Sequence, residues 1–265
     1  MMIDSIDDPR VQPFRQVRDR DLMRTDGLFI GEGPLTVDKM LSIPGLTRSV
    51  LVAERWAERY QSAEANGVEV LVAPKQVMSQ IVGFNFHRGV IATGERKAYE
   101  NRPYPELIPM VDKPATLLVV DGVTNVDNIG LLFRNAAAFA CDAVILSKGC
   151  CDPLYRKALR VSLGHVLSTP WCVVDDLQVA KTWLTSAKVT VVAAALNEDS
   201  VSLSDFKTPS RVALIVGQER HGISPELLEQ VDHTVKIPMA AGVDSLNVAA
   251  ASAVCLHHLS QGQRF

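Results

Sequence analysis

The sequence predicts an α/β protein with a mostly parallel sheet covered by helices. Short, continuous apolar runs of strand length recur along the second half of the chain, and segments with helical spacing separate them. Such runs are typical of strands buried on both faces, as in parallel sheets. A polar stretch with four prolines, residues 95–115, predicts a linker. We therefore expect a small α/β domain at 1–108 and a larger α/β domain at 109–265.

In the first half, β-branched runs bounded by glycine and charged residues predict strands. These strands are expected at 27–33, 49–54, 68–73 and 89–94. Charged, helix-compatible segments separate them. This half therefore also reads as α/β.

In the second half, short continuous apolar runs alternate more clearly with helical segments. They predict strands at 116–121, 143–147, 171–175, 189–196, 211–217 and 233–238. The apolar segment LNVAAASAVCLHHL predicts a final helix that begins near Ser245.

Three polar, glycine-containing segments follow strands of this second half. They are DGVTNVDNIG after its first strand, GQERHGIS after its fifth and MAAGVDSLN after its sixth. Ligands of open parallel sheets bind beyond the carboxyl ends of the strands, so these segments predict a site at one edge of the sheet.

The motifs that the sequence lacks restrict the class of ligand that this site could bind. The chain contains neither GxGxxG nor GxxxxGK[ST], which argues against NAD and ATP and favours a ligand without phosphates. The fold class alone would allow a nicotinamide oxidoreductase, but the missing phosphate-binding loop argues against this function. The chain also lacks a GxSxG nucleophile elbow, and its cysteines and histidines show no spacing typical of a metal site.

One charged residue interrupts an apolar helical segment. Arg134 stands within IGLLFRNAAAFA, and no acidic residue lies within four positions of it. A buried charge without a partner is costly, so either the side chain reaches water or it is placed to meet a ligand. The other polar residues of the three loops each have a structural alternative as helix caps, turn glycines or surface groups. These residues are Asn128, Gly217, Glu219, Gly222, Ser245 and Asn247.

The formal net charge of −3 does not indicate nucleic-acid binding by the chain as a whole. A local basic run does occur at 155–160. The acidic start MMIDSIDDPR does not resemble a signal peptide, and no uncharged apolar run approaches the roughly 20 residues that span a bilayer. Five scattered cysteines indicate structural thiols in a reducing compartment. We expect a cytoplasmic protein without a membrane segment or a metal.

The motif residues together resemble a known family. Asn128-x-Gly130-xxx-Arg134, then Gly217-x-Glu219-xx-Gly222, then Ile237-Pro238-Met239 with Ser245-Leu246-Asn247 are similar to the three motifs of the SpoU (TrmH-like) RNA methyltransferases of the SPOUT superfamily. The segment 152–171 also resembles the family's region between the first two motifs. More loosely, RDRDLMRTDGLFIGEG and HRGVIATGE resemble the ribosomal-protein-like substrate-binding domain that often precedes this catalytic domain.

The resemblance implies a catalytic domain with a deep trefoil knot, a homodimer, and S-adenosylmethionine as cofactor. The implied reaction is methyl transfer to a ribose 2′-hydroxyl of structured RNA, with ribosomal RNA favoured over transfer RNA. The implied cofactor contacts are Ala194, Gly217, Gly222, Ile237 and Leu246.

The implied catalytic group is Arg134, oriented together with the nucleotide by Asn128, Glu219, Ser245 and Asn247. A guanidinium is ordinarily only a donor. Two roles stay open: Arg134 stabilises the developing alkoxide and grips the adjacent phosphate, or a perturbed environment makes it the base.

RNA is expected to bind the N-terminal domain and local basic residues. These are Arg24, Arg156, Lys157 and Arg160, and the alternative for the basic run is a solvated helix face. Three other functions stay open, namely a transfer RNA ribose methyltransferase, a SPOUT enzyme that methylates a base nitrogen, and a non-catalytic RNA-binding SPOUT protein.

Overall fold

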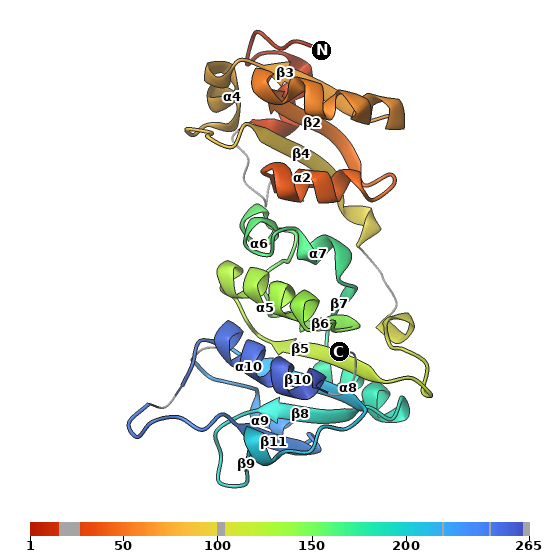
Figure 1. Cartoon of the computed structure of the whole chain (residues 1–265), viewed down its shortest axis with the longest axis vertical. Coiled ribbons are helices and arrows are strands. Elements are labelled where there is room, and N and C mark those ends of the chain that lie inside the picture. The colour runs from red at the N-terminus through yellow and green to blue at the C-terminus, as the bar shows by residue number, and fades with distance from the viewer. Residues whose placement is uncertain (16–26, 100–103, 219, 244, 262–265) are drawn as a thin grey trace. The chain divides into compact units, whose positions relative to one another are not determined.

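The computed structural model describes all residues except 16–26, 100–103, 219, 244 and 262–265. Contacts group the chain into two compact units (Figure 1). The first unit is Met1–Glu100 with Leu154–Leu167, and the second is Asn101–Pro153 with Ser168–Phe265. The division into domains 1–108 and 109–265 stays a prediction, and the contacts differ from it by grouping Leu154–Leu167 with the first unit.

The first unit contains a four-stranded mixed sheet in the order β1-β4-β2-β3. β4 pairs antiparallel with β1 and β2, and β2 pairs parallel with β3. The strands are β1 (Leu28–Glu32), β2 (Thr47–Ala53), β3 (Glu69–Ala73) and β4 (Val90–Glu95). All four lie where the β-branched runs predict them, because these runs supply the buried face of the sheet.

Short helices complete the first unit. The α-helices are α2 (Pro34–Leu41), α3 (Ala57–Tyr60), α4 (Lys75–Val82), α6 (Arg156–Val161) and α7 (His165–Ser168), whose last residue falls in the second unit. The 3₁₀ helices are η1 (Pro9–Phe14), η2 (Glu54–Trp56), η3 (Gln61–Asn66) and η4 (Arg96–Ala98). One core of the unit joins η1 and α4 to the sheet through Val11, Phe14, Leu51, Met78 and Ile91.

The second unit contains a seven-stranded sheet in the order β7-β6-β5-β10-β8-β11-β9, and every recorded strand pair in it is parallel. This confirms the predicted parallel α/β architecture. The strands are β5 (Ala115–Asp121), β6 (Ala143–Ser147), β7 (Trp171–Val174), β8 (Thr190–Ala194), β9 (Val201–Ser202), β10 (Arg211–Gly217) and β11 (His233–Lys236). The sequence analysis missed only β9, which is two residues long.

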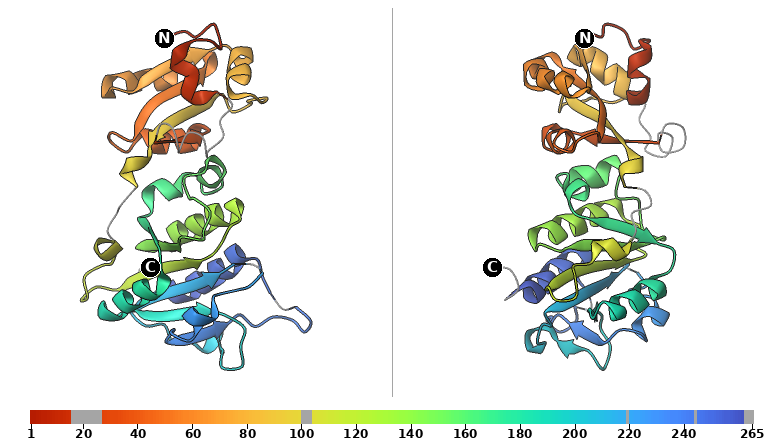
Figure 2. Two further views of the ribbon diagram at one scale, coloured as in Figure 1. Left: turned by 180° about the vertical axis from the view of Figure 1, so that it is seen from behind. Right: turned by 90° about the vertical axis from the view of Figure 1, so that its right-hand side faces the viewer.

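Helices cover both faces of this sheet (Figure 2). They are α5 (Val126–Ala138), α8 (Leu177–Ser186), α9 (Pro225–Leu228) and α10 (Val248–Ser260), with the 3₁₀ helices η5 (Tyr104–Leu107) and η6 (Leu203–Asp205). Residues such as Leu117, Ile145 and Ile215 form a core with α8 and α9. Alternate strand residues face the opposite side, where α5 packs against β6, α10 against β10, and the two helices against each other.

The final helix begins later than predicted. It starts at Val248, because the Asn247 side chain caps it by accepting hydrogen bonds from the backbone N–H groups of Ala249 and Ala250. Ser245 and Leu246 therefore stay outside the helix.

All five cysteines are free thiols. Burial raises the pKa of Cys172 and of Cys255 to about 12, so both keep their protons near neutral pH. This agrees with the interpretation of these two residues as structural thiols. Among the helices of the described residues, none has the length and apolarity that crossing a bilayer requires.

Arg211 at the start of β10 is a buried cation held by carbonyl groups. Its guanidinium donates to the backbone oxygens of Ala187 at 3.1 Å, Met110 at 2.8 Å and Pro109 at 2.9 Å, and also to that of Lys113. Four acceptors compensate its desolvation. The interaction fixes the segment 109–113, the end of the predicted linker, to the base of the second unit.

We expect Arg211→Met to lower the free energy of unfolding by about 2–4 kcal/mol, because it leaves buried carbonyls without donors. The free energy of unfolding of Arg211→Lys should lie between those of the wild type and Arg211→Met, since one ammonium group cannot reach all four oxygens. Urea denaturation measures both. The control is Lys148→Met, which removes an ion pair with Asp175 that is exposed at both ends and should change stability little. Wild-type stability of Arg211→Met would contradict this anchoring role.

Candidate functional site

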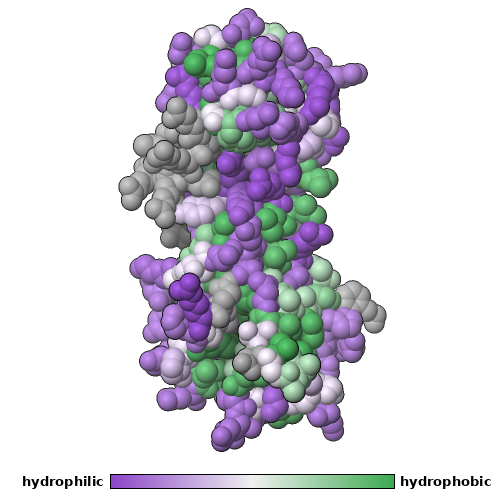
Figure 3. All heavy atoms as spheres, turned by 90° about the vertical axis from the view of Figure 1, so that its left-hand side faces the viewer, coloured by the Kyte–Doolittle hydropathy of each residue, from purple (hydrophilic) through white to green (hydrophobic). Residues whose placement is uncertain are grey.

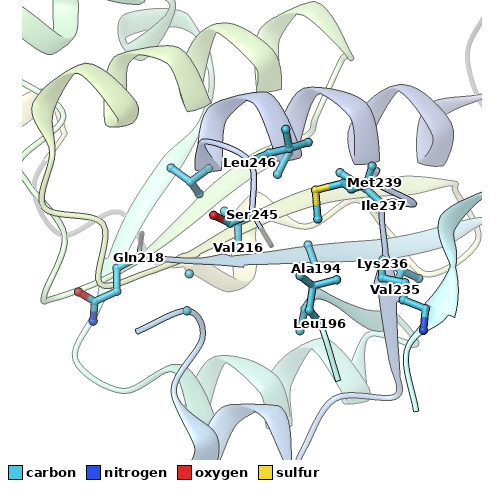
Figure 4. Close-up of a pocket in the computed structure, with 15 residues that line it drawn as sticks. Ala194, Leu196, Val216, Gln218, Val235, Lys236, Ile237, Met239, Ser245 and Leu246 are labelled. Carbon is cyan, nitrogen blue, oxygen red and sulfur yellow. The ribbon is translucent and has the colours of Figure 1, made fainter. Parts of the chain in front are cut away.

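A cavity of about 180 Å³ lies at the carboxyl ends of β8, β10 and β11, beneath the segment that leads into α10. Apolar side chains surround most of it, and Gln218 and Lys236 lie at its opposite ends (Figure 4). The lining residues include Ala194, Leu196, Val216, Ile237, Met239, Ser245 and Leu246. Among the described residues of this lining, Lys236 is the single charged one, and the apolar side chains suit a largely apolar ligand group.

The structure brings together all five residues predicted to contact a cofactor. Ala194, Gly217, Gly222, Ile237 and Leu246 line this cavity, and so does Ser245, which was predicted as a catalytic residue. Glu219 lies outside the described residues. Gln218 and Lys236 were not predicted, although each lies beside a predicted position. Met239 belongs to the third motif but was not predicted to contact the cofactor.

The three predicted loops do meet, since Asp121 contacts Ser224 and Asn128 contacts Asn247, but they do not all line the cavity. The segment 121–130 after β5 does not line the cavity, whereas residues 194–196 after β8 do. The reason is the strand order, since β10 lies between β5 and β8, and β8 and β11 flank the side where the cavity opens. Apolar runs alone do not specify this order.

The turn after β10 depends on two glycines. Gln218 and Gly222 form a two-residue antiparallel bridge, with N–H···O distances of 3.1 Å and 2.9 Å. A Cβ at Gly217 would lie 2.2 Å from the carbonyl carbon and oxygen of Gly222. Gly222 itself has a φ of +70°. The close backbone approach therefore excludes any side chain at Gly217.

Asp121 anchors the end of this loop, and the sequence analysis did not identify it. Its carboxylate, at the end of β5, accepts hydrogen bonds from the Ser224 N–H at 3.0 Å and from the Ser224 hydroxyl at 2.8 Å. Ser224 immediately precedes α9. The signal in the sequence is a carboxylate that ends an otherwise apolar strand.

Two asparagines join the first loop to the third. The Asn247 amide donates to the Asn128 side-chain oxygen at 2.9 Å. Asn128 is 5% exposed and lies in the first turn of α5. It does not cap that helix, because Asn125 provides the cap by accepting from the N–H groups of Asp127 and Asn128. Asn247 therefore has two roles, the cap of α10 and the bridge to α5.

We expect Asn128 and Asn247 to be energetically coupled by about 1 kcal/mol, the usual net value of one hydrogen bond. The cycle combines Asn128→Ala with Asn247→Ser, because serine keeps a helix cap but has no amide to donate. Chemical denaturation of the wild type, both single variants and the double variant measures the coupling. Strictly additive losses would show that the bridge contributes nothing.

Arg134 reaches solvent from an otherwise buried stretch of α5. Its neighbours Leu132 and Phe133 are fully buried, whereas Arg134 is exposed and makes no ion pair within the described part of the chain. The next residue, Asn135, donates to the Ala249 carbonyl at 2.6 Å and to the Ser252 hydroxyl at 2.8 Å, and so links α5 to α10. The helix therefore presents a free guanidinium on a rigid support.

The predicted RNA-contacting arginines have a protein partner. Arg156 and Arg160 each place a guanidinium nitrogen 3.7 Å from the carboxylate of Glu32, which is 5% exposed, and Arg88 lies 3.6 Å from the same group. Lys157 is exposed. Arg24 lies outside the described residues. Within the described part of the chain, three arginines thus share the carboxylate of Glu32.

Comparison with known proteins identifies the family to which this chain is similar. The SpoU rRNA Methylase family model matches residues 115–257. An uncharacterized tRNA/rRNA methyltransferase of Mycobacterium tuberculosis is 34% identical over 271 residues, covering 97% of this chain and 92% of that protein. The 23S rRNA (guanosine-2′-O-)-methyltransferase RlmB of Escherichia coli is 33% identical over 194 residues, covering 73% of this chain and 79% of that protein.

Solved structures show the same fold. The AdoMet-bound rRNA methyltransferase from Sinorhizobium meliloti superimposes with a TM-score of 0.84 at 24% identity, covering 98% of this chain and 97% of that chain. The match extends over both units of the chain.

Proposed function

Because the chain belongs to the SpoU rRNA methylase family, we propose that it transfers a methyl group from S-adenosylmethionine to the 2′-hydroxyl of a ribose in ribosomal RNA. The observation that carries this proposal is the cavity at the ends of β8, β10 and β11, which lies inside the matched region. The E. coli relative is named for this reaction on 23S rRNA.

The cavity fits the cofactor. Its lining is mainly apolar, and the absence of a side chain at Gly217 leaves the backbone of the turn open to a flat ring. Ala194, Gly217, Gly222, Ile237 and Leu246 would hold S-adenosylmethionine there, and no phosphate-binding loop is needed for it. When bound, this cofactor supplies an electrophilic methyl group on sulfur.

The residues of the chain then act on the ribose. The 2′-oxygen would accept the methyl group as the carbon–sulfur bond breaks and S-adenosylhomocysteine leaves, and the hydroxyl proton must pass to solvent during or before the attack. Arg134 is assigned to stabilise the developing alkoxide and to bind the adjacent RNA phosphate, because a guanidinium is a donor with a pKa too high for an ordinary base. Asn128, Glu219, Ser245 and Asn247 are assigned to orient Arg134 and the nucleotide. The bridge between Asn247 and Asn128 supports a positioning role for that pair.

The same proposal includes the finer architecture. The knot is supported by the placement of α10, which packs on both α5 and β10 after the chain has left the sheet at β11. A substrate-binding domain at 1–108 and a SPOUT domain at 109–265 agree with the match of the family model to residues 115–257. A ribosomal substrate would place the protein in the cytoplasm.

A homodimer is supported by uncovered apolar surface. Figure 3 shows apolar side chains gathered on one face of the second unit. Large apolar residues around the cavity and on α10 are 43–55% exposed, namely Leu196, Val243, Leu246 and Val254. Such a surface is typical of an interface, and a second copy would cover it.

The test is incubation of the protein with tritiated S-adenosylmethionine and separate ribosomal and transfer RNA fractions, followed by mapping of ribose methylation. We expect label on a ribose of ribosomal RNA. Label confined to transfer RNA would favour the alternative function, a transfer RNA ribose methyltransferase. The M. tuberculosis relative is named as a tRNA/rRNA methyltransferase. Cofactor binding without transfer to either fraction would favour the non-catalytic RNA-binding alternative.

A further inference from the structure

A second cavity lies wholly within the first unit. It has a volume of about 130 Å³ and lies where β2 ends, where α4 begins and beside the loop that precedes β4. Its lining is more polar than that of the first cavity and consists of Ala53, Glu54, Arg55, Lys75, Phe86, His87 and Gly89. Two cationic groups and an imidazole therefore face one carboxylate, that of Glu54.

Among the described residues, Arg55 is held in position by carbonyl and ring contacts and not by a carboxylate. Its guanidinium donates to the His87 carbonyl oxygen at 2.8 Å, and its Cζ lies 5.8 Å from the centre of the Trp56 ring. The Trp56 indole is itself fixed, because its Nε1 donates to the Arg88 carbonyl at 3.1 Å. The indole also packs against Gly89, where an added Cβ would lie 3.2 Å from Trp56 Cδ1.

Arg55 differs in this respect from the other arginines nearby. Arg59 also stacks on Trp56, at 5.5 Å, but pairs with Asp38 at 2.6 Å, and Arg88 pairs with Glu32. Within the described part of the chain, neither Arg55 nor Lys75 makes an ion pair. Their charges are therefore available to a ligand.

We propose that Arg55, Lys75 and His87 form a binding site for a backbone phosphate of the RNA. The inference rests on the proposed function in one respect: the RNA that binds here is taken to be the RNA that is methylated. A guanidinium fixed by carbonyl and ring contacts presents its remaining N–H groups as a fork, which matches two phosphate oxygens. Lys75 adds a point charge from the first residue of α4, a helix that has no side-chain cap and whose first N–H groups favour an anion.

The charge balance of the whole chain favours such a local site. The formal net charge is −3, so attraction to RNA must come from patches where cations outnumber carboxylates. Arg59 also stacks on the Trp56 ring, although its own charge is paired with Asp38, so the unpaired charge beside this ring is that of Arg55. This arrangement of stacked arginines suits an RNA strand rather than a small free anion.

The test compares two double variants of the full chain. Arg55→Gln with Lys75→Gln removes both unpaired cations of the site. The matched control, Arg48→Gln with Lys97→Gln, removes two exposed cations of the same unit. Arg48 lies near the start of β2 and Lys97 just after the end of β4, and because these strands are antiparallel, both lie at the other end of the sheet. Binding of bulk ribosomal RNA is measured by filter retention over a series of salt concentrations.

We expect the site variant to bind ribosomal RNA about tenfold more weakly. The slope of log affinity against log salt concentration should decrease in magnitude by roughly 1, as for the loss of one phosphate contact. The control variant should stay within about twofold of the wild type. Equal behaviour of the two variants would overturn the proposal. Circular dichroism on heating verifies that both variants fold.

Methyl transfer separates this site from the proposed function. If both hold, the site variant should show a higher KM for RNA with kcat unchanged, and calorimetry should show unchanged affinity for S-adenosylmethionine. If the wild type transfers no methyl group but the site variant still binds RNA more weakly than the control, the proposed function fails and the phosphate site stands.

Discussion

Arg134→Ala is expected to lower methyl transfer at least about a hundredfold, the usual effect of removing one donor to a developing oxyanion, while affinity for S-adenosylmethionine stays nearly unchanged. Arg134 is exposed and does not line the cavity, so its removal leaves the cofactor contacts intact. The apolar face of α5 also stays buried. Calorimetry with S-adenosylmethionine and a tritium-transfer assay on ribosomal RNA measure the two effects separately.

Arg134→Lys serves as the matched variant. Lysine keeps the charge but lacks the planar fork, so it should retain part of the activity if the role is stabilisation of charge. Added guanidinium should then partly rescue Arg134→Ala. Full activity of the alanine variant would contradict a catalytic role. Loss of cofactor affinity with the fold intact would instead place Arg134 among the groups that support the cavity.

The strands were predictable because strands buried on both faces consist almost entirely of consecutive apolar residues. Runs such as TLLVVD and RVALIVG are apolar at every position except their two ends, and each lies buried on both faces as β5 or β10. β9 was not predicted because two residues are too few to show the hydrophobic pattern of a strand. The start of α10 was misplaced because Ser245 and Asn247 are both good caps, and only tertiary structure selects Asn247.

Five residues that line the cavity were predictable, and so was the meeting of the three loops, but which loops form the cavity wall was not. The resemblance identified the five cavity residues, and the structure brings them together. The order of strands decides which loops form the cavity wall, and this order depends on long-range pairing that no local run encodes. The paired anchors Asp121 with Ser224 and Asn247 with Asn128 were missed for the same reason, since each joins residues more than 100 positions apart.

Gly217→Ala is expected to abolish most cofactor binding. The new methyl group would overlap the backbone of Gly222 at 2.2 Å and the Ile223 nitrogen at 2.3 Å, and a backbone contact cannot be relieved by rotating a side chain. The turn 218–222 must therefore move away from β10, which opens the cavity wall. Strain of about 3 kcal/mol placed on the bound geometry would weaken affinity for S-adenosylmethionine about a hundredfold. Calorimetry measures the affinity, and urea denaturation measures the accompanying loss of stability.

Gly222→Ala separates the steric effect from a general effect of alanine in this turn. Gly222 also lines the cavity, but an added Cβ there meets nothing within 4 Å, and only its φ of +70° disfavours a side chain. The cost should be about 1–2 kcal/mol in stability, with a much smaller loss of affinity than for Gly217→Ala. If the two variants lost affinity equally, strain of the turn rather than overlap at Gly217 would control the cavity. If Gly217→Ala bound the cofactor as the wild type does, the close approach of Gly217 and Gly222 would have no part in shaping the site.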